Sequence, residues 1–167
     1  VNFIDNAEAY AAGQAEITVG NIISGMKRSD LVISSKVFWG GEGPNDRGLS
    51  RKHVFEACHA ALRRLQLDYL DLYFCHRHDE NTPIEETVQT MDMLIRQGKI
   101  LYWGTSEWTA EQLQEAYDAC DKHGWIKPTM EQPQYNMFHR ARVEQELLSH
   151  YTKYGLGTTI WSPLASG

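Results

Sequence analysis

Four residues of this chain have side chains suited to acid–base chemistry, and three of them close apolar runs. Asp5 closes the run VNFID, Lys36 closes LVISSK and His76 closes YLDLYFCH, while Tyr10 follows Asp5 by five residues. A tyrosine hydroxyl protonates a substrate oxygen near neutral pH when a nearby cation favours loss of its proton, and Lys36 would be that cation. Asp5 would keep Lys36 charged in a partly dry site, and His76 would orient a carbonyl group or share the proton. The set therefore predicts proton transfer to the oxygen of a small carbonyl substrate.

Each of the four residues also has a structural explanation when it is taken alone. An aspartate at a strand end often caps the next helix, and a loop tyrosine such as Tyr10 is commonly a surface residue. A lone histidine such as His76 is often a satisfied core residue, whereas Lys36 stands in an otherwise apolar run and needs a partner. Placement at three successive strand ends favours a shared site, because (β/α) barrels carry their active sites at the C-terminal ends of the strands.

Three later runs end in polar residues that suit amide recognition better than metal binding: Ser106, Gln132 and Ser162. The motif His76-Arg77-His78 has the form of several hydrolytic metal sites, so a metal-dependent barrel hydrolase is an alternative. Such a site needs further His or Asp at later strand ends, and we therefore predict no metal. Trp161 offers a flat face for stacking a planar ring, or it is simply a core aromatic.

These residues are spaced along a regular alternation of strand-like and helix-like segments. The strand-like runs are VNFID, LVISSKV, YLDLYFCH, ILYWGTS, TMEQPQYN and GTTIWSP, and helical patterns separate them at residues 15–26, 50–66, 83–97, 110–123 and 143–154. Such apolar runs indicate strands of a buried parallel sheet. A doubly wound sheet would normally carry a glycine-rich phosphate turn after its first strand, and no GxGxxG occurs. The pattern therefore predicts an α/β fold of the (β/α) barrel type, with the long loop 38–49 at a strand C-terminus.

Local signals mark the ends and the buried face of several predicted helices. Capping boxes are expected at Thr82–Glu85 and Thr109–Gln112, and Gly98 and Gly124 mark helix ends. An apolar stripe at helical spacing on residues 50–66 should pack against the sheet: Val54, Cys58, Ala61, Leu62 and Leu65.

The composition indicates one globular domain, with 167 residues of which 42% are apolar and 23% charged. A net charge of −6 without a Lys/Arg run predicts no nucleic-acid or anionic-membrane partner, and no stretch approaches the roughly 18 apolar residues of a membrane helix. Cys58, Cys75 and Cys120 lack the spacing of a disulfide framework or metal site, which favours a reducing compartment, here the cytoplasm. Both ends of the chain lie inside apolar runs, so we expect one barrel domain over residues 1–167, truncated at both ends.

Several motifs make the chain resemble the aldo-keto reductase family, most closely the branch that contains potassium-channel β subunits and their bacterial, plant and fungal relatives. The motifs are FIDNAEAYAAGQAE, VISSKVFWGG, GLSRKHV, LQLDYLDLYFCHRHDENTPIEETV, YWGTSEW, EQPQYNMF and WSPLASG. The resemblance implies a partial (β/α)8 TIM barrel, of which this chain supplies strands two to seven with the intervening helices.

The resemblance also implies a role for each candidate residue. The family's catalytic tetrad matches Asp5, Tyr10, Lys36 and His76. Its cofactor-binding positions match Ser106, Gln132, Trp161, Ser162, Pro163, Leu164, Ser166 and Gly167. Tyr10 would be the general acid, Ser106 and Gln132 would hold the carboxamide of NADP(H), and Trp161 would stack on the nicotinamide. The residues from Ser162 onward would begin the pyrophosphate-binding loop, and the implied reaction is reduction of aldehydes or ketones to alcohols by hydride transfer.

Two positions depart from parts of the family. Vertebrate channel β subunits carry asparagine where this chain has His76 and are slow reductases, so His76 favours a working enzyme. Glu107 stands where the family usually has asparagine or arginine, and the sequence assigns it no role in the site.

An auxiliary subunit that regulates a voltage-gated potassium channel is the alternative function, and a homo-oligomer stays open. The aromatics Trp39 and Trp108 are expected to be exposed, where they line a substrate pocket or pack on loops.

Overall fold

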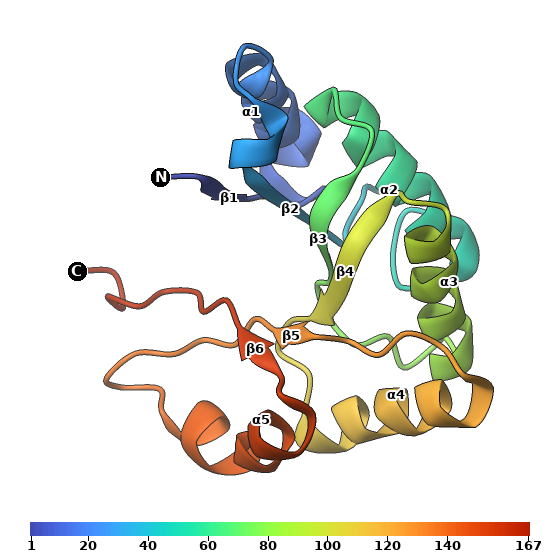
Figure 1. The fold of residues 1–167 in the computed structure, drawn as a ribbon, viewed down its shortest axis with the longest axis vertical. Coiled ribbons are helices and arrows are strands. Elements are labelled where there is room, and N and C mark those ends of the chain that lie inside the picture. Colours follow the sequence, from blue (N-terminus) through green and yellow to red (C-terminus); the bar gives the residue numbers. More distant parts are fainter.

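Six parallel strands form one curled sheet in the computed structural model, which describes residues 1–167. In chain order the strands are β1 (Phe3–Asp5), β2 (Val32–Val37), β3 (Leu70–Cys75), β4 (Ile100–Thr105), β5 (Met130–Glu131) and β6 (Gly157–Thr158). Each strand pairs with the next one along the chain. Figure 1 shows the sheet as an open arc, with both chain ends on its open side.

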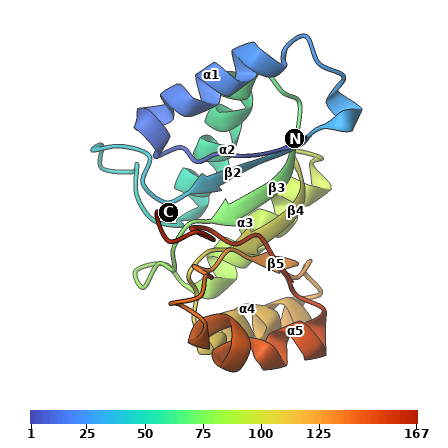
Figure 2. The ribbon, with the colours of Figure 1, turned by 90° about the vertical axis from the view of Figure 1, so that its left-hand side faces the viewer.

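Five α-helices connect the strands: α1 (Gln14–Ile23), α2 (Arg51–Leu65), α3 (Ile84–Arg96), α4 (Ala110–His123) and α5 (Leu148–Tyr154). They lie along the outer, convex side of the arc (Figures 1 and 2). A doubly wound sheet carries helices on both faces, whereas a barrel carries them on the outside only. The arrangement therefore confirms the predicted partial (β/α)8 barrel.

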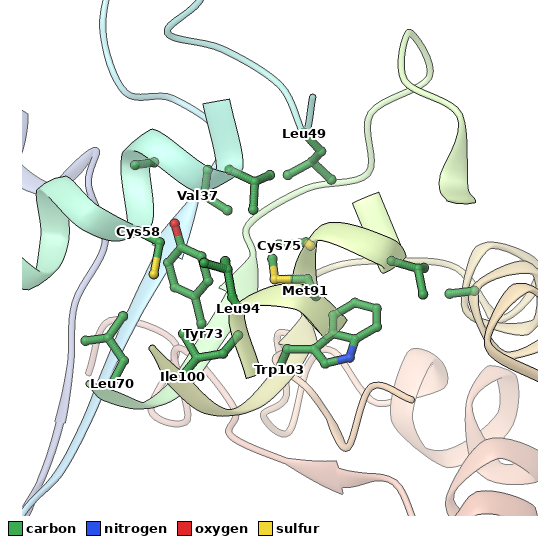
Figure 3. Packing of buried hydrophobic residues seen from close by; sticks show 14 of the residues in the cluster. Val37, Leu49, Cys58, Leu70, Tyr73, Cys75, Met91, Leu94, Ile100 and Trp103 are labelled. Atoms are coloured by element: carbon green, nitrogen blue, oxygen red, sulfur yellow. The ribbon is translucent and has the colours of Figure 1, made fainter. Parts of the chain in front are cut away.

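The main core lies between the sheet and these helices. Tyr73 of β3 and Trp103 of β4 are fully buried there, together with Met91 and Leu94 of α3 (Figure 3). The predicted stripe of α2 is also buried: Val54, Cys58, Ala61, Leu62 and Leu65. Burying a large apolar side chain stabilises the fold by roughly 1.5–3 kcal/mol, so this layer holds the strands in place while their C-terminal ends carry polar groups.

The last two strands are shorter than the sequence pattern predicts. β5 ends at Glu131, two residues before Pro133, which has no backbone N–H to donate to a neighbouring strand. β6 ends at Thr158, so the expectation that Ser162 closes a strand is wrong. A single bridge between Gln134 and Trp161 continues the pairing beyond both strands. The predicted helix 143–154 is divided into a π-helical turn (Arg142–Glu146) and α5.

Local capping signals are confirmed at one helix and wrong at another. Thr109 and Gln112 form the predicted reciprocal capping box of α4, and Gly124 ends that helix in a left-handed conformation. At α3 the N-cap residue is Pro83, with no side-chain cap. The hydroxyl of Thr82 donates instead to Asp79, at 2.8 Å, so the helix lacks the predicted capping box.

The expected exposure of Trp108 is also wrong. Its side chain is completely buried and packs edge-on against His78, with 4.9 Å between ring centroids. The preceding residue, Glu107, has a φ of 60°, and the amide of Trp108 donates to the buried carboxylate of Glu131 at 3.3 Å. The turn after β4 thus directs Trp108 into the core.

Candidate active site

Lys36, on β2, is the centre of the predicted acid–base set. Its side chain is wholly inaccessible to solvent, and an ammonium group in such a place needs partners for all three of its hydrogens. Nζ donates to Asp5 Oδ2 at 2.7 Å, to the backbone oxygen of Asn6 at 2.8 Å and to the hydroxyl of Tyr10 at 3.0 Å. Because every hydrogen of the cation has a partner, Lys36 holds Asp5 and Tyr10 in one rigid arrangement.

Asp5 also connects Lys36 to a residue beyond β5. The β1–β2 register places Asp5 opposite Ser34, whose hydroxyl donates to Oδ1 of Asp5. Oδ2 of Asp5 also accepts a hydrogen bond of 3.3 Å from Nε2 of Gln132, which follows β5. The carboxylate is therefore shared between the predicted catalytic residues and the predicted cofactor residues.

Tyr10 lies in a 3₁₀ turn (Tyr10–Gly13) just after β1 and is 40% exposed. Its ring lies edge-on to that of His76, with 6.0 Å between centroids. The hydroxyl thus touches the buried cation of Lys36 on one side while the side chain remains reachable from solvent. A carbonyl oxygen placed against this hydroxyl can receive its proton, because the neighbouring cation stabilises the phenolate that remains.

His76 directly follows β3 and completes the set. Burial, ahead of the positive charges of Lys36 and Arg77, lowers the pKa of His76 to about 4, so the imidazole is neutral near pH 7. Its Nδ1 is buried without a hydrogen-bond partner. The ring packs edge-on against Trp39, at 4.9 Å between centroids, and Trp39 is 37% exposed as predicted. A neutral imidazole beside Tyr10 can orient a carbonyl without competing with it as a strong acid.

The two histidines of the His76-Arg77-His78 motif do not form a metal site. His76 packs against Trp39, whereas His78 packs against the buried ring of Trp108. No group of three or more His, Cys, Asp or Glu side chains is arranged to hold a metal ion.

The polar residues after β4 and β5 lie beside the tetrad. The hydroxyl of Ser106 donates to the backbone oxygen of Gln132 at 2.9 Å, and both residues are almost fully buried. Gln132 Nε2 donates to Asp5 and to the hydroxyl of Thr159, at 3.1 Å, and no group of the chain donates to its Oε1. Trp161 presents a half-exposed indole, and its Nε1 donates to the carboxylate of Glu107 at 2.8 Å.

This geometry, a buried lysine between an aspartate and a tyrosine with a histidine at the next strand end, agrees with the family suggested by the motifs. A family model described as "Aldo/keto reductase family" matches residues 1–167. The chain belongs to the aldo/keto reductase family.

Two plant relatives of this aldo/keto reductase chain carry a channel-related name. A probable voltage-gated potassium channel subunit beta of Arabidopsis thaliana is 57% identical, and one of Oryza sativa subsp. japonica is 53% identical, each over the whole of this chain. A solved aldo/keto reductase of Klebsiella pneumoniae, in complex with NADP and acetate, matches 99% of this chain with a TM-score of 0.84 and 34% identity. The chain spans about half the length of these proteins, namely 52% of each plant relative and 54% of the bacterial chain.

The predicted pyrophosphate-loop residues are only loosely tied to the rest of the site. The backbone oxygen of Ser162 accepts from Asn136 Nδ2 at 3.0 Å. Ser162 and Ser166 have φ of 51° and 75°, in the left-handed region that residues other than glycine rarely adopt. The side chains of Pro163, Leu164 and Ser166 make no hydrogen bond, so the role of these residues and of Gly167 stays a prediction.

Three further residues of the site were missed by sequence reasoning. They are Asn6, Ser34 and Arg77, whose guanidinium donates to His76 O at 2.5 Å and to Ser106 Oγ at 3.4 Å. Glu107, to which the sequence assigned no role, also lies in the site, because it accepts from the indole of Trp161. A signal existed for Ser34, because it stands two positions before Lys36 and side chains two apart share one face of a strand. For the others the contact depends on loop conformation.

None of the helices combines the length and the apolar character that spanning a membrane requires.

Proposed function

We propose that the complete protein is an NADP-dependent oxidoreductase that reduces aldehydes or ketones to alcohols, with Tyr10 as the general acid. The observation that carries this proposal is the wholly buried Lys36, whose Nζ lies 2.7 Å from Asp5 and 3.0 Å from the hydroxyl of Tyr10. Burying a charged lysine is costly unless its charge is balanced by partners. Here the balanced cation contacts the half-exposed phenol of Tyr10. That arrangement fits proton donation to a substrate oxygen.

The residues after β4, β5 and β6 fit a nicotinamide. A carboxamide needs hydrogen-bond acceptors for its NH2 group. Gln132 Oε1 is available as an acceptor, and Ser106 Oγ keeps one lone pair beside the one that Arg77 uses. A planar ring needs a flat partner, which the half-exposed indole of Trp161 offers. The bacterial relative of known structure was solved with NADP, which supports this choice of cofactor. When bound, the reduced nicotinamide would supply the hydride.

The protein residues would handle the proton and the orientation of the substrate. Tyr10 donates its hydroxyl proton to the carbonyl oxygen as negative charge develops there, and Lys36 stabilises the phenolate left behind. Asp5, held by Ser34 and Gln132, keeps Lys36 in place. His76 is neutral, so it directs the carbonyl oxygen towards Tyr10 with an uncharged N–H rather than as an acid.

The neighbourhood of the phenol favours a small substrate with a planar or apolar body. The exposed ring of Trp39 packs on His76 and begins the loop after β2, next to the position where the carbonyl would lie. Aldehydes attached to an aromatic ring would bury that ring against Trp39.

The test is oxidation of NADPH by the complete chain with 4-nitrobenzaldehyde, comparing wild type with Tyr10→Phe. Removing a positioned general acid should lower kcat by about 10²–10⁴-fold while the dissociation constant of NADPH stays unchanged. Tyr102→Phe, which removes a hydroxyl from an exposed tyrosine of β4, is the matched control and should keep wild-type activity. Turnover that survives in Tyr10→Phe would reject Tyr10 as the acid. No turnover in wild type despite NADPH binding would reject the reductase.

A second candidate function is an auxiliary subunit that regulates a voltage-gated potassium channel. The names of the two plant relatives favour it. An intact acid–base set does not contradict this role, because one barrel can bind a cofactor and a channel. Co-purification of a channel domain with the complete chain would support the regulatory role. NADPH turnover by the wild type, measured separately, tests the reductase. In either role we place the protein in the cytoplasm, which its buried, free cysteines at positions 58, 75 and 120 support.

A further inference from the structure

Glu107 joins the ends of three strands at the predicted nicotinamide site. It follows Ser106 after β4, and its Oε1 accepts from the backbone N–H of Gln134, beyond β5, at 2.6 Å. The same oxygen accepts from the indole Nε1 of Trp161, beyond β6, at 2.8 Å. Both bonds are short, as expected when the acceptor is charged.

The backbone of Glu107 is arranged for this contact at an energetic cost. Its φ is 60°, in the left-handed region that residues other than glycine rarely adopt. Strained positions of this kind persist where the surrounding structure holds them, and they concentrate at functional sites. Here the result is that the carboxylate points to Trp161 while Trp108, the next residue, turns into the core.

The indole of Trp161 depends on Glu107 for its orientation. Its backbone is held by Pro133 O, at 3.1 Å, and by Tyr135 N, at 3.4 Å, but these bonds leave the side-chain torsions free. The only hydrogen bond of the Trp161 side chain is the one to Glu107. The ring remains 37% exposed, so a face is left for stacking.

The negative charge of Glu107 is not neutralised by an ion pair. Its two hydrogen-bond donors are neutral, and none of the salt bridges of the chain includes it. The other carboxyl group near this turn is that of Glu131, which is wholly buried and accepts hydrogen bonds from Thr105 and Trp108. The neighbouring cation Arg77 is bonded to Ser106 and to the backbone of His76 rather than to Glu107.

We propose that Glu107 is a positioning residue for Trp161 and that its carboxylate makes this site prefer the oxidised, positively charged form of the nicotinamide over the reduced form. The inference rests on the proposed function. The oxidised ring carries a positive charge that the reduced ring lacks, so an unpaired carboxylate one hydrogen bond away from the stacking indole stabilises only the oxidised form. By linkage, tighter binding of the oxidised form lowers the reduction potential of the bound couple and makes it a stronger hydride donor.

The experiment measures the dissociation constants of NADP⁺ and NADPH for the complete chain by quenching of tryptophan fluorescence. Glu107→Gln keeps an oxygen acceptor for Trp161 and removes the charge. We expect the ratio Kd(NADP⁺)/Kd(NADPH) to rise about tenfold, which for a two-electron couple corresponds to about 30 mV in the potential of the bound cofactor. Glu115→Gln, an exposed residue of α4 with no hydrogen bond, makes the same change in net charge and should leave the ratio unchanged. An unchanged ratio in Glu107→Gln would overturn the electrostatic preference.

A second readout tests the positioning role without any cofactor. In the ¹⁵N-tryptophan-labelled complete chain, the indole N–H resonance of Trp161, assigned by its loss in Trp161→Phe, reports the hydrogen bond to Glu107. It should move upfield in Glu107→Ala and move much less in Glu107→Gln, which retains an acceptor. A resonance that stays in place in Glu107→Ala would overturn the positioning role. Wild-type protein that binds neither nucleotide would reject both the proposed function and the redox preference, while the indole resonance would still decide the positioning role.

Discussion

Glu131 offers the sharpest test of the electrostatics at the strand ends. Its side chain is wholly buried at the end of β5, where the hydroxyl of Thr105 and the amide of Trp108 donate to it. Burial, with a smaller contribution from the charge of Glu107, raises the pKa of Glu131 from 4.5 to about 8, against the lowering effect of those hydrogen bonds. The folded protein therefore keeps this carboxyl protonated at pH 7, whereas the unfolded chain ionises it.

The consequence for stability follows from proton linkage. Between the two pKa values the folded state binds one more proton than the unfolded state, so the free energy of unfolding falls as pH rises, starting near 4.5 and ending near 8. Each pKa unit is worth about 1.4 kcal/mol, and the part of the window between about pH 6 and about pH 9 is worth about 3 kcal/mol. The side chain of Glu131→Gln is neutral in both states and carries no such loss.

The assay is urea unfolding of the complete chain at these two pH values, for wild type and for Glu131→Gln. Other groups titrate in the same range, but they titrate equally in both proteins, so the variant serves as the control. We expect wild type to lose about 3 kcal/mol more than Glu131→Gln on going to the higher pH. Equal losses in the two proteins would show that Glu131 is ionised in the folded state, and the reasoning from burial would then be refuted.

Three further predictions concern the tetrad and the packing of the sheet. Lys36→Met should lower kcat for NADPH-dependent aldehyde reduction by roughly 10²-fold or more, since the phenolate loses its counter-charge; a steady-state assay with an unchanged kcat would contradict this. Because the pKa of His76 is lowered to about 4, the pH profile of kcat/KM should lack a step from His76 above about pH 5, and a wild-type step near 6.5 that His76→Gln abolishes would contradict it. Gly104→Ala should destabilise the complete chain by about 2 kcal/mol or more in urea unfolding, because its Cβ would lie 2.3 Å from the backbone oxygen of Met130, whereas Gly25→Ala, with nothing within 4 Å, should change stability little. Equal stability of the two glycine variants would contradict the close approach of β4 and β5.

The periodicity of the sequence was sufficient to predict the helices and strands but not the residues at which they end. Apolar runs and helical stripes predict all six strands and the five α-helices. The apolar runs of β2 to β5 follow from their burial in a parallel sheet, whereas β1 and β6, at the two edges, are mostly exposed. The lengths of β5 and β6 are different from the prediction, since Pro133 has no backbone N–H to donate beyond β5 and residues 159–160 do not continue β6. The capping box expected at Thr82 is absent for a related reason, because Asp79 competes for the same hydroxyl.

The sequence by itself determined the type and order of the elements and placed Asp5, Lys36 and His76 at successive strand ends, since those properties depend on spacing along the chain. Tertiary structure alone decided that Lys36 Nζ meets Tyr10 at 3.0 Å and that Gln132 reaches Asp5 across 127 positions of sequence. It also decided the contact between Glu107 and Trp161, which are 54 positions apart. Contacts of this kind depend on how the curled sheet brings its strand ends together and on the conformations of the loops beyond them. A hydrogen bond requires placement within a few tenths of an ångström, which local sequence preferences do not specify.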